Sequence, residues 1–209
     1  MRDIWQQITS NDVTQTETLI DSLNQPALTQ EHAAELDKEY SESNEEFFFS
    51  DYIGYSPLQL AARLNKEAVF VTLLEVLTKT DSNNEAFKKK LHIVDQLLKA
   101  SYQRDSMEGC KSIHFAIFKN NVNIVKHHVD IDQLIQRHLP DTLSLLETRG
   151  ALRCDYNLIA FTMQFNKRNA IDILKLIVNK KRSKPKKVLG LPLSSLRFQP
   201  LQIMFSLLQ

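Results

Sequence analysis

The sequence predicts an all-α protein, a helical solenoid made of repeated turn-and-helix units with extra inserted helices. Residues 54–62 join a turn to the start of a helix, and weaker copies of this segment recur along the 209-residue chain. The chain has only 4 Gly and 6 Pro, whereas an all-β chain needs many tight turns. Stacked units of this kind bury their apolar faces against neighbours and share an exposed flank. We therefore expect a protein that works by binding.

The most complete unit begins at Asp51. Gly54 permits a backbone angle that other residues resist, Ser56 can cap the following helix, and Pro57 suits its first position. Asn65 follows this helix, and asparagine is second only to glycine as a left-handed helix end. The motif residues of the unit are Asp51, Gly54, Ser56, Pro57, Leu58, Ala61 and Ala62.

A second, more degenerate unit begins at Gly109. Ile113, His114 and Ala116 occupy the positions that Leu-Gln-x-Ala fills in the first unit, and Asn120 again follows the helix. Poorer copies lie near the N-terminus, around residue 159 and around residue 201. The units are expected to start near residues 4, 58, 113, 159 and 201, within one domain that spans residues 1–209.

These units resemble the ankyrin repeat, whose pattern runs Asp-x-x-Gly-x-Thr-Pro-Leu-His-x-Ala-Ala-x-x-Gly before a second helix. The resemblance implies an ankyrin-like solenoid in which His114 hydrogen-bonds an adjacent turn. It also implies that the turn tips and first helices contact a protein partner. The chain departs from the family in its spacing, since the ankyrin period is about 33 residues and these units are longer. HEAT and armadillo units, of about 40–47 residues, are the all-helical alternatives.

The extra length of each unit is expected to form additional helices. Apolar residues recur at helical spacing through residues 83–103, which predicts an amphipathic helix there. We also expect helices over residues 29–40, capped by Thr29, and over residues 131–138 and 141–149, which are separated by Pro140. The apolar stripe of the first of these helices comprises Phe87, Leu91, Val94, Leu98 and Tyr102.

The expected function is non-catalytic protein–protein interaction by a monomer, with an unidentified protein partner and without a cofactor. Tyr52 and Tyr55 lie at a turn tip, where aromatic side chains make low-entropy anchors for a partner. Arg63 and Lys119 are expected to extend the same surface.

The charge of the chain is strongly uneven. Residues 1–60 hold 2 Lys or Arg and 12 Asp or Glu, a balance of −10, and the remaining 24 and 13 give residues 61–209 a balance of +11. The acidic part includes Glu35 and Asp37 and precedes Phe47, Phe48 and Phe49. These phenylalanines could form an exposed docking patch, or some of them could pack an inserted helix onto the unit below.

The basic part includes a run of cationic residues within a predicted loop over residues 179–192. Repulsion and Pro185 favour an extended, solvated loop between units. The alternatives are a nuclear-import signal, nucleic-acid binding and anionic-lipid binding. Nucleic acid is the less favoured of these because no aromatic residue is interleaved for stacking. The cationic residues are Lys180, Lys181, Arg182, Lys184, Lys186 and Lys187.

Catalytic and metal sites are not expected. Cys110 and Cys154 do not form a paired metal motif, and no orienting partner for a nucleophile is evident. Adjacent helical residues such as His127 and His128 point about 100° apart and cannot easily share one ion. With no apolar run of membrane-spanning length and no secretory signal, a reducing, cytoplasmic compartment is expected.

The composition resembles that of translocated effectors of intracellular bacterial pathogens, which carry degenerate ankyrin repeats with long inserts. That resemblance would place the chain in the cytoplasm or nucleus of a host cell, acting on a host protein. The alternatives are a nuclear or nucleic-acid-associated adaptor that uses residues 180–187, and the interaction domain of a longer effector enzyme.

Overall fold

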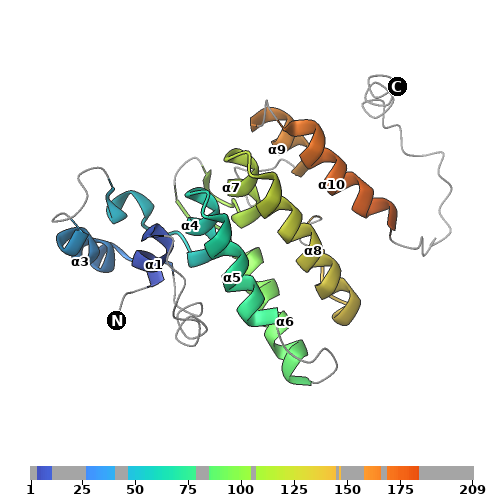
Figure 1. Cartoon of the computed structure of the whole chain (residues 1–209), viewed down its shortest axis with the longest axis horizontal. Helices are drawn as coiled ribbons and strands as arrows, with labels where there is room; N and C mark the ends of the chain where they lie inside the picture. Colours follow the sequence, from blue (N-terminus) through green and yellow to red (C-terminus); the bar gives the residue numbers. More distant parts are fainter. Residues whose placement is uncertain are drawn as a thin grey trace.

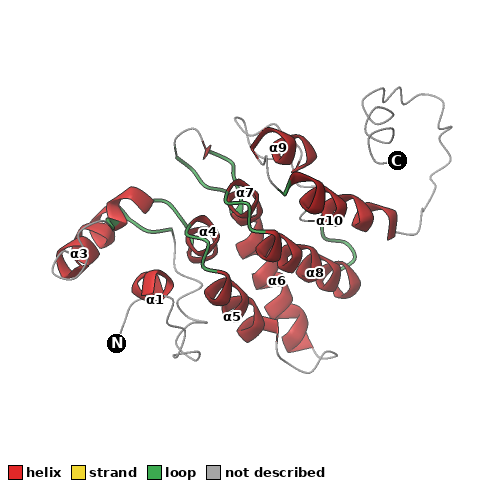
Figure 2. Ribbon diagram, turned by 45° about the horizontal axis from the view of Figure 1, so that its top comes forward, coloured by secondary structure: helices red, strands yellow, loops and turns green. Residues whose placement is uncertain are grey.

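The computed structural model describes residues 4–10, 27–40, 47–78, 85–104, 107–144, 146, 158–165 and 169–183. Every regular element within these ranges is helical (Figures 1 and 2), so the predicted all-α class is confirmed. None of the described helices is long and apolar enough to cross a membrane. The expected unit near residue 201 and the candidate residues Cys154, Lys184, Lys186 and Lys187 lie outside the described residues.

The helices follow one another along the chain in short segments. They are α1 (Ile4–Ser10), α3 (Gln30–Tyr40), the 3-10 turn η1 (Phe49–Tyr52), α4 (Pro57–Arg63), α5 (Glu67–Thr78), α6 (Glu85–Lys99), α7 (Ser112–Phe118), α8 (Val122–His138), α9 (Leu158–Phe165) and α10 (Ala170–Ser183).

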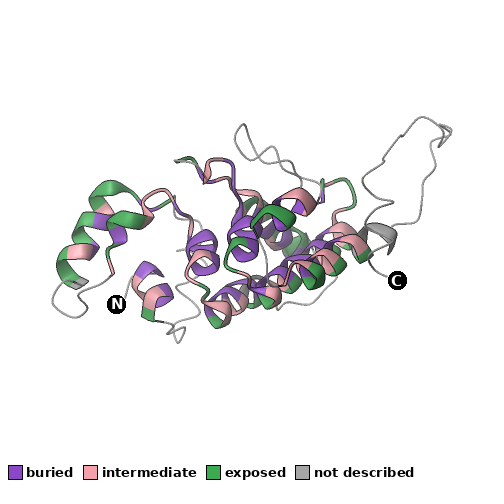
Figure 3. Ribbon diagram, turned by 90° about the horizontal axis from the view of Figure 1, so that it is seen from above, coloured by how far each residue is buried: buried purple, intermediate pink, exposed green. Residues whose placement is uncertain are grey.

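Three consecutive helix pairs, α4–α5, α7–α8 and α9–α10, lie side by side (Figure 1). The first helix of each pair contacts the first helix of the next, and the second helices contact one another in the same order. The first helices α4 and α7 are almost entirely buried, whereas α5 and α8 keep exposed residues on their outer side (Figure 3). At the N-terminal side, α1 packs against α4.

Helix α6 is an insertion between the first and second pairs, as predicted, but it ends at Lys99, so Tyr102 of the predicted stripe lies beyond it. The buried face carries Phe87, Leu91, Val94 and Leu98. The helix contacts α5 of the first pair and both α7 and α8 of the second. It therefore braces the two pairs against each other, while Lys88 and Lys89 remain exposed.

The turn before a helix pair has the same hydrogen bonds in both of the clearest units. Gly54 and Gly109 occupy equivalent places and adopt φ values of +89° and +84°, which favour glycine. In each unit the glycine and the next residue pair with one upstream residue. The backbone bonds join Leu28 N–H to Tyr55 O (3.0 Å), Gly54 N–H to Leu28 O (2.8 Å), Tyr102 N–H to Cys110 O (2.8 Å) and Gly109 N–H to Tyr102 O (2.7 Å).

The helix ends of the first unit follow the predicted chemistry. The Ser56 hydroxyl accepts from the Gln59 N–H (3.3 Å), and the Gln59 side-chain oxygen accepts from the Ser56 N–H (2.9 Å), which makes a capping box. Asn65 and Asn120 end their helices in the left-handed region, with φ of +59° and +62°. Both asparagines therefore serve as the expected substitutes for glycine.

Asn120 gives a direct test of this substitution. Its side-chain oxygen is buried without a hydrogen-bond partner, so the side chain contributes little there. We expect Asn120→Gly to be neutral or stabilising, because glycine adopts positive φ without steric cost. Asn120→Ala should be less stable than Asn120→Gly by about 1–2 kcal/mol, since its Cβ crowds the carbonyl oxygen in that conformation. Urea unfolding measures both, and an alanine variant as stable as the glycine variant would contradict the assignment.

The inserted segments were predicted only in part. The Thr29 hydroxyl accepts from the His32 N–H (3.2 Å), so the predicted cap of the helix over residues 29–40 is confirmed. Phe49 is fully buried and Phe48 is half exposed, so part of the phenylalanine cluster packs inward. The separate helix predicted over residues 131–138 is wrong, because α8 runs unbroken from Val122 to His138.

The short helix predicted over residues 141–149 is also wrong for its described part. Residues 141–144 form a turn instead. The Thr142 hydroxyl donates to the Leu139 carbonyl (2.8 Å), and the Gln136 amide donates to the Thr142 carbonyl (2.9 Å). These bonds satisfy the end of α8 locally and fold the chain back on itself.

Candidate interaction face

Tyr55 was predicted to contact a partner, and this prediction is wrong. Its side chain is buried, with its ring centroid 4.4 Å from that of Tyr102 and 5.0 Å from that of Phe115. The turn folds back over the next unit, so the ring fills the space between units. Burial raises the pKa of its phenol, although Arg63 acts in the opposite direction. Tyr55 therefore belongs to the core.

Tyr52 lies at the edge of the same aromatic cluster. It is partly buried, and its ring stacks on that of Phe47 with centroids 5.1 Å apart. Burial also raises its pKa, and the charge of Arg63 opposes that shift. Tyr52 therefore lies near the surface, close enough to Arg63 for the two side chains to interact electrostatically.

Three first helices end in a continuous row of side chains. Arg63, Phe118 and Phe165 are the last residues of α4, α7 and α9. The guanidinium carbon of Arg63 lies 5.1 Å from the centroid of the Phe118 ring, a cation–π contact. The Phe118 and Phe165 rings follow with centroids 6.2 Å apart. We call Arg63, Phe118, Lys119 and Phe165 the helix-end row.

The apolar members of the helix-end row are unusually exposed for their size. Phe118 is 39% exposed and Phe165 37%. Phe165 also packs on the buried Phe161, with centroids 4.5 Å apart, which fixes its position. Neither of these phenylalanines was predicted from the sequence to lie on the interaction surface. The available clue was position, since Phe118 stands 55 residues after Arg63, the same interval that separates Leu58 from Ile113.

Lys119 extends the row with a second positive charge. Its side chain is exposed, and its pKa is lowered by partial desolvation first and by the charge of Arg63 second. Arg63 and Lys119 therefore lie close enough to repel each other. Both were predicted to lie on the interaction surface, and the structure brings them together.

His114 and Gln59 occupy the same position in successive first helices. The Gln59 amide donates to the Ala100 carbonyl of the following unit (2.8 Å) while its oxygen caps its own helix. The His114 Nδ1 accepts from the Lys111 N–H (3.0 Å), so Nε2 carries the proton. Nε2 is buried without a hydrogen-bond partner. His114 is thus a structural residue of the unit, and its pKa falls to about 3 through burial and, secondarily, the charge of Lys111.

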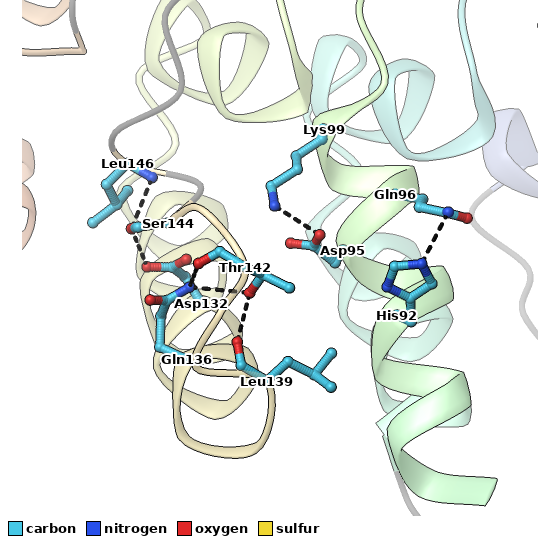
Figure 4. A network of polar contacts seen from close by, with 10 residues as sticks. All are labelled: His92, Asp95, Gln96, Lys99, Asp132, Gln136, Leu139, Thr142, Ser144 and Leu146. Carbon is cyan, nitrogen blue, oxygen red and sulfur yellow. Dashed lines mark hydrogen bonds and ion pairs between the residues drawn. The ribbon is translucent and has the colours of Figure 1, made fainter. Parts of the chain in front are cut away.

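Two buried carboxylates elsewhere are paired locally, one within α6 and one between α8 and the turn that follows it. The Lys99 amine contacts the buried Asp95 carboxylate (2.7 Å), and the Ser144 hydroxyl donates to the buried Asp132 carboxylate (2.8 Å), as Figure 4 shows. Within the described ranges, no group of three or more His, Cys, Asp or Glu residues could hold a metal ion. Cys110 is fully buried, which keeps its thiol from solvent.

A pocket of about 300 Å³ lies where the chain turns from first to second helices. The Asn121 amide donates to the Asn65 oxygen (2.6 Å) and the Asn123 amide donates to the Glu67 carboxylate (3.0 Å). Asn121 also caps α8 by accepting from the Ile124 N–H (2.8 Å). The lining side chains therefore link adjacent units.

The predicted basic loop differs from the structure at its start. Helix α10 continues to Ser183, so the backbone of Lys180, Lys181 and Arg182 is helical rather than extended. Helix formation is favourable here because lysine and arginine are good helix formers and suit a helix C-terminus. The break expected from Pro185 lies outside the described residues.

Comparisons of the chain with protein-family models, with curated proteins and with solved structures find no match. The geometry of the described residues is the basis for the functional interpretation. That geometry offers an exposed row of rings and cations on stacked helices.

Proposed function

We propose that the chain is a non-catalytic protein–protein interaction module, folded as an ankyrin-like helical solenoid with inserted helices. The support for this proposal is that the same arrangement of turn and helices recurs along the chain. The hydrogen-bonded turn with a left-handed glycine, the short first helix, the left-handed asparagine and the second helix occur twice in the same order. A third pair, α9–α10, stacks on the second.

The main support for binding is the helix-end row itself. It takes one side chain from the end of each of three successive first helices and adds Lys119. The helices that position these side chains are packed into the core, so little conformational entropy is lost when a partner docks. Interface hot spots are enriched in aromatic and arginine side chains, and the row presents exposed rings beside a guanidinium group.

The test is partner capture with a charge-reversed row. A tagged chain with Arg63→Glu and Lys119→Glu should lose a stoichiometric protein partner that the unaltered chain retains in the same cells. Quantitative mass spectrometry of the captured material measures that loss. We expect the retained amount of partner to fall at least about tenfold, since like charges brought together at an interface cost several kcal/mol.

A matched control separates this effect from a change in overall charge. Lys89 on α6 and Lys126 on α8 are exposed and lie outside the row, so Lys89→Glu with Lys126→Glu alters the net charge equally. The control chain should keep its partner. Equal retention by all three chains, or equal loss from both variants, would refute the assignment of the face.

A further inference from the structure

The helix-end row holds two positive charges, Arg63 and Lys119, and the described part of the chain supplies no carboxylate that pairs with either of them. Other lysines form such ion pairs on their own helices. Those pairs are Lys88 with Glu85 (2.9 Å), Lys99 with Asp95 (2.7 Å) and Lys175 with Asp172 (3.8 Å).

From this we propose that the row binds an acidic amphipathic peptide segment of a protein partner, with carboxylates against Arg63 and Lys119 and apolar side chains against Phe118 and Phe165. The inference rests on the proposed interaction function and specifies its partner. Carboxylates match a guanidinium group and an ammonium group placed close together, and their binding would relieve the repulsion between the two cations.

The apolar side chains of the row explain why a partner segment that carries only negative charge would not fit the whole row. Phe118 and Phe165 are both more than a third exposed, and covering such surface gains about 25 cal/mol per Å² of apolar area removed from water. A purely acidic segment would leave these side chains wet. The occupant therefore has apolar residues next to its acidic ones, as in the helix-in-groove mode of peptide recognition.

The ring geometry favours a peptide over a single-stranded nucleic acid. Base stacking needs a free ring face, but one face of Phe118 already lies against the Arg63 guanidinium at 5.1 Å. Phe165 is tilted by 38° against Phe161 at 4.5 Å, which occupies one side of its ring as well. Moreover, nucleic-acid affinity grows with the number of phosphates neutralised, and the row offers two cations.

Fluorescence anisotropy with the purified full chain and synthetic probes tests the proposal. The first probe is a helical peptide of about fifteen residues with glutamates along one side and leucine and phenylalanine along the other. The second replaces glutamate by lysine, the third replaces the apolar residues by serine, and the fourth is a single-stranded oligonucleotide. We expect binding of the first probe alone, weakening as salt is raised.

Variants assign that binding to the row. Arg63→Gln with Lys119→Gln should raise the dissociation constant of the first probe at least about tenfold, as loss of two charge contacts predicts. Lys119→Glu alone should act in the same direction, and its exposed position leaves the fold intact. Lys89→Gln with Lys126→Gln is the control and should bind as the unaltered chain does.

The outcomes separate this inference from the proposed function. Binding of the lysine probe, the serine probe or the oligonucleotide as tightly as the first probe would overturn the acidic amphipathic occupant. So would a row variant that binds the first probe unchanged, or self-association of the chain through the row in light scattering. If the charge-reversed row still loses its captured partner, the function stands and only the inferred chemistry fails. If partner capture is also unaffected, both fail.

Discussion

Replacing Phe115 with alanine is expected to lower the free energy of unfolding by about 3–5 kcal/mol, the usual cost of removing a buried phenylalanine. Phe115 is fully buried on α7, and its ring lies 5.0 Å from that of Tyr55 and 5.8 Å from that of Tyr102. These residues come from two successive turns and one first helix. Because small domains are stable by only about 5–15 kcal/mol, this one cavity should remove much of the total.

Urea unfolding followed by circular dichroism measures this change. Leu143→Ala provides the control, because the Leu143 side chain is 70% exposed in the turn after α8; exposed substitutions usually stay within about 0.5 kcal/mol of the parent. Phe115→Leu should fall between the two. A Phe115→Ala variant within about 1 kcal/mol of the unaltered chain would show that this aromatic cluster does not join the units.

Acidification from pH 7 to pH 5 is expected to lower the free energy of unfolding by about 2 kcal/mol for each of two buried histidines. Burial is the main cause that lowers the pKa of His114 to about 3 and that of His128 to about 4, from an ordinary value of 6.5. Below pH 6.5 the two histidines are therefore protonated in the unfolded chain while they stay neutral in the folded chain. The stabilisation is complete above that pH and is lost as the pH falls toward 4.

The contacts of His128 explain why its ring stays neutral. Nδ1 lies 2.9 Å from the Ile124 carbonyl, which can only accept, so Nδ1 carries the proton. Nε2 then accepts from the Ser112 hydroxyl at 2.9 Å. The ring also stacks on Phe70, with centroids 4.9 Å apart. A proton added at Nε2 would place a positive charge inside the core, which is costly even though the Ser112 hydroxyl could turn to accept from it.

His114→Gln isolates one of the two titrations. Gln59, at the equivalent position, accepts from the N–H three residues upstream just as His114 accepts from the Lys111 N–H, so the variant should fold. Its loss of unfolding free energy between pH 7 and pH 5 should be about 2 kcal/mol smaller than that of the unaltered chain. His92→Gln, a change on the exposed side of α6, should leave the pH dependence unchanged. An equal pH dependence in the His114→Gln chain would contradict the assignment.

Local rules predicted the helical elements where the residues concerned interact with their own neighbours. The cap at Ser56, the left-handed ends at Asn65 and Asn120 and the stripe of α6 all depend on contacts within a few residues. Such contacts are encoded in short segments. The separate helix predicted over residues 131–138 does not form, because an unbroken buried stripe that includes Val129 and Ile135 keeps α8 continuous.

The surface residues were harder to predict because exposure depends on where the next unit lies. Tyrosine is a residue type common in interfaces, but the neighbouring turn and Phe115 cover Tyr55. Phenylalanine is a residue type common in cores, but Phe118 lies at a helix end and is partly exposed. Sequence alone identified Arg63 and Lys119, since charged side chains remain near water in either arrangement.

Helix α6 gives the assembly a mechanical asymmetry. It joins the first two helix pairs through α5, α7 and α8, whereas the described contacts between the second and third pairs are those of α7 with α9 and α8 with α10. The Phe118–Phe165 contact crosses the second of these junctions, between α7 and α9. A ligand that contacts both rings would therefore bind two helix pairs at once, and its binding energy would oppose their separation.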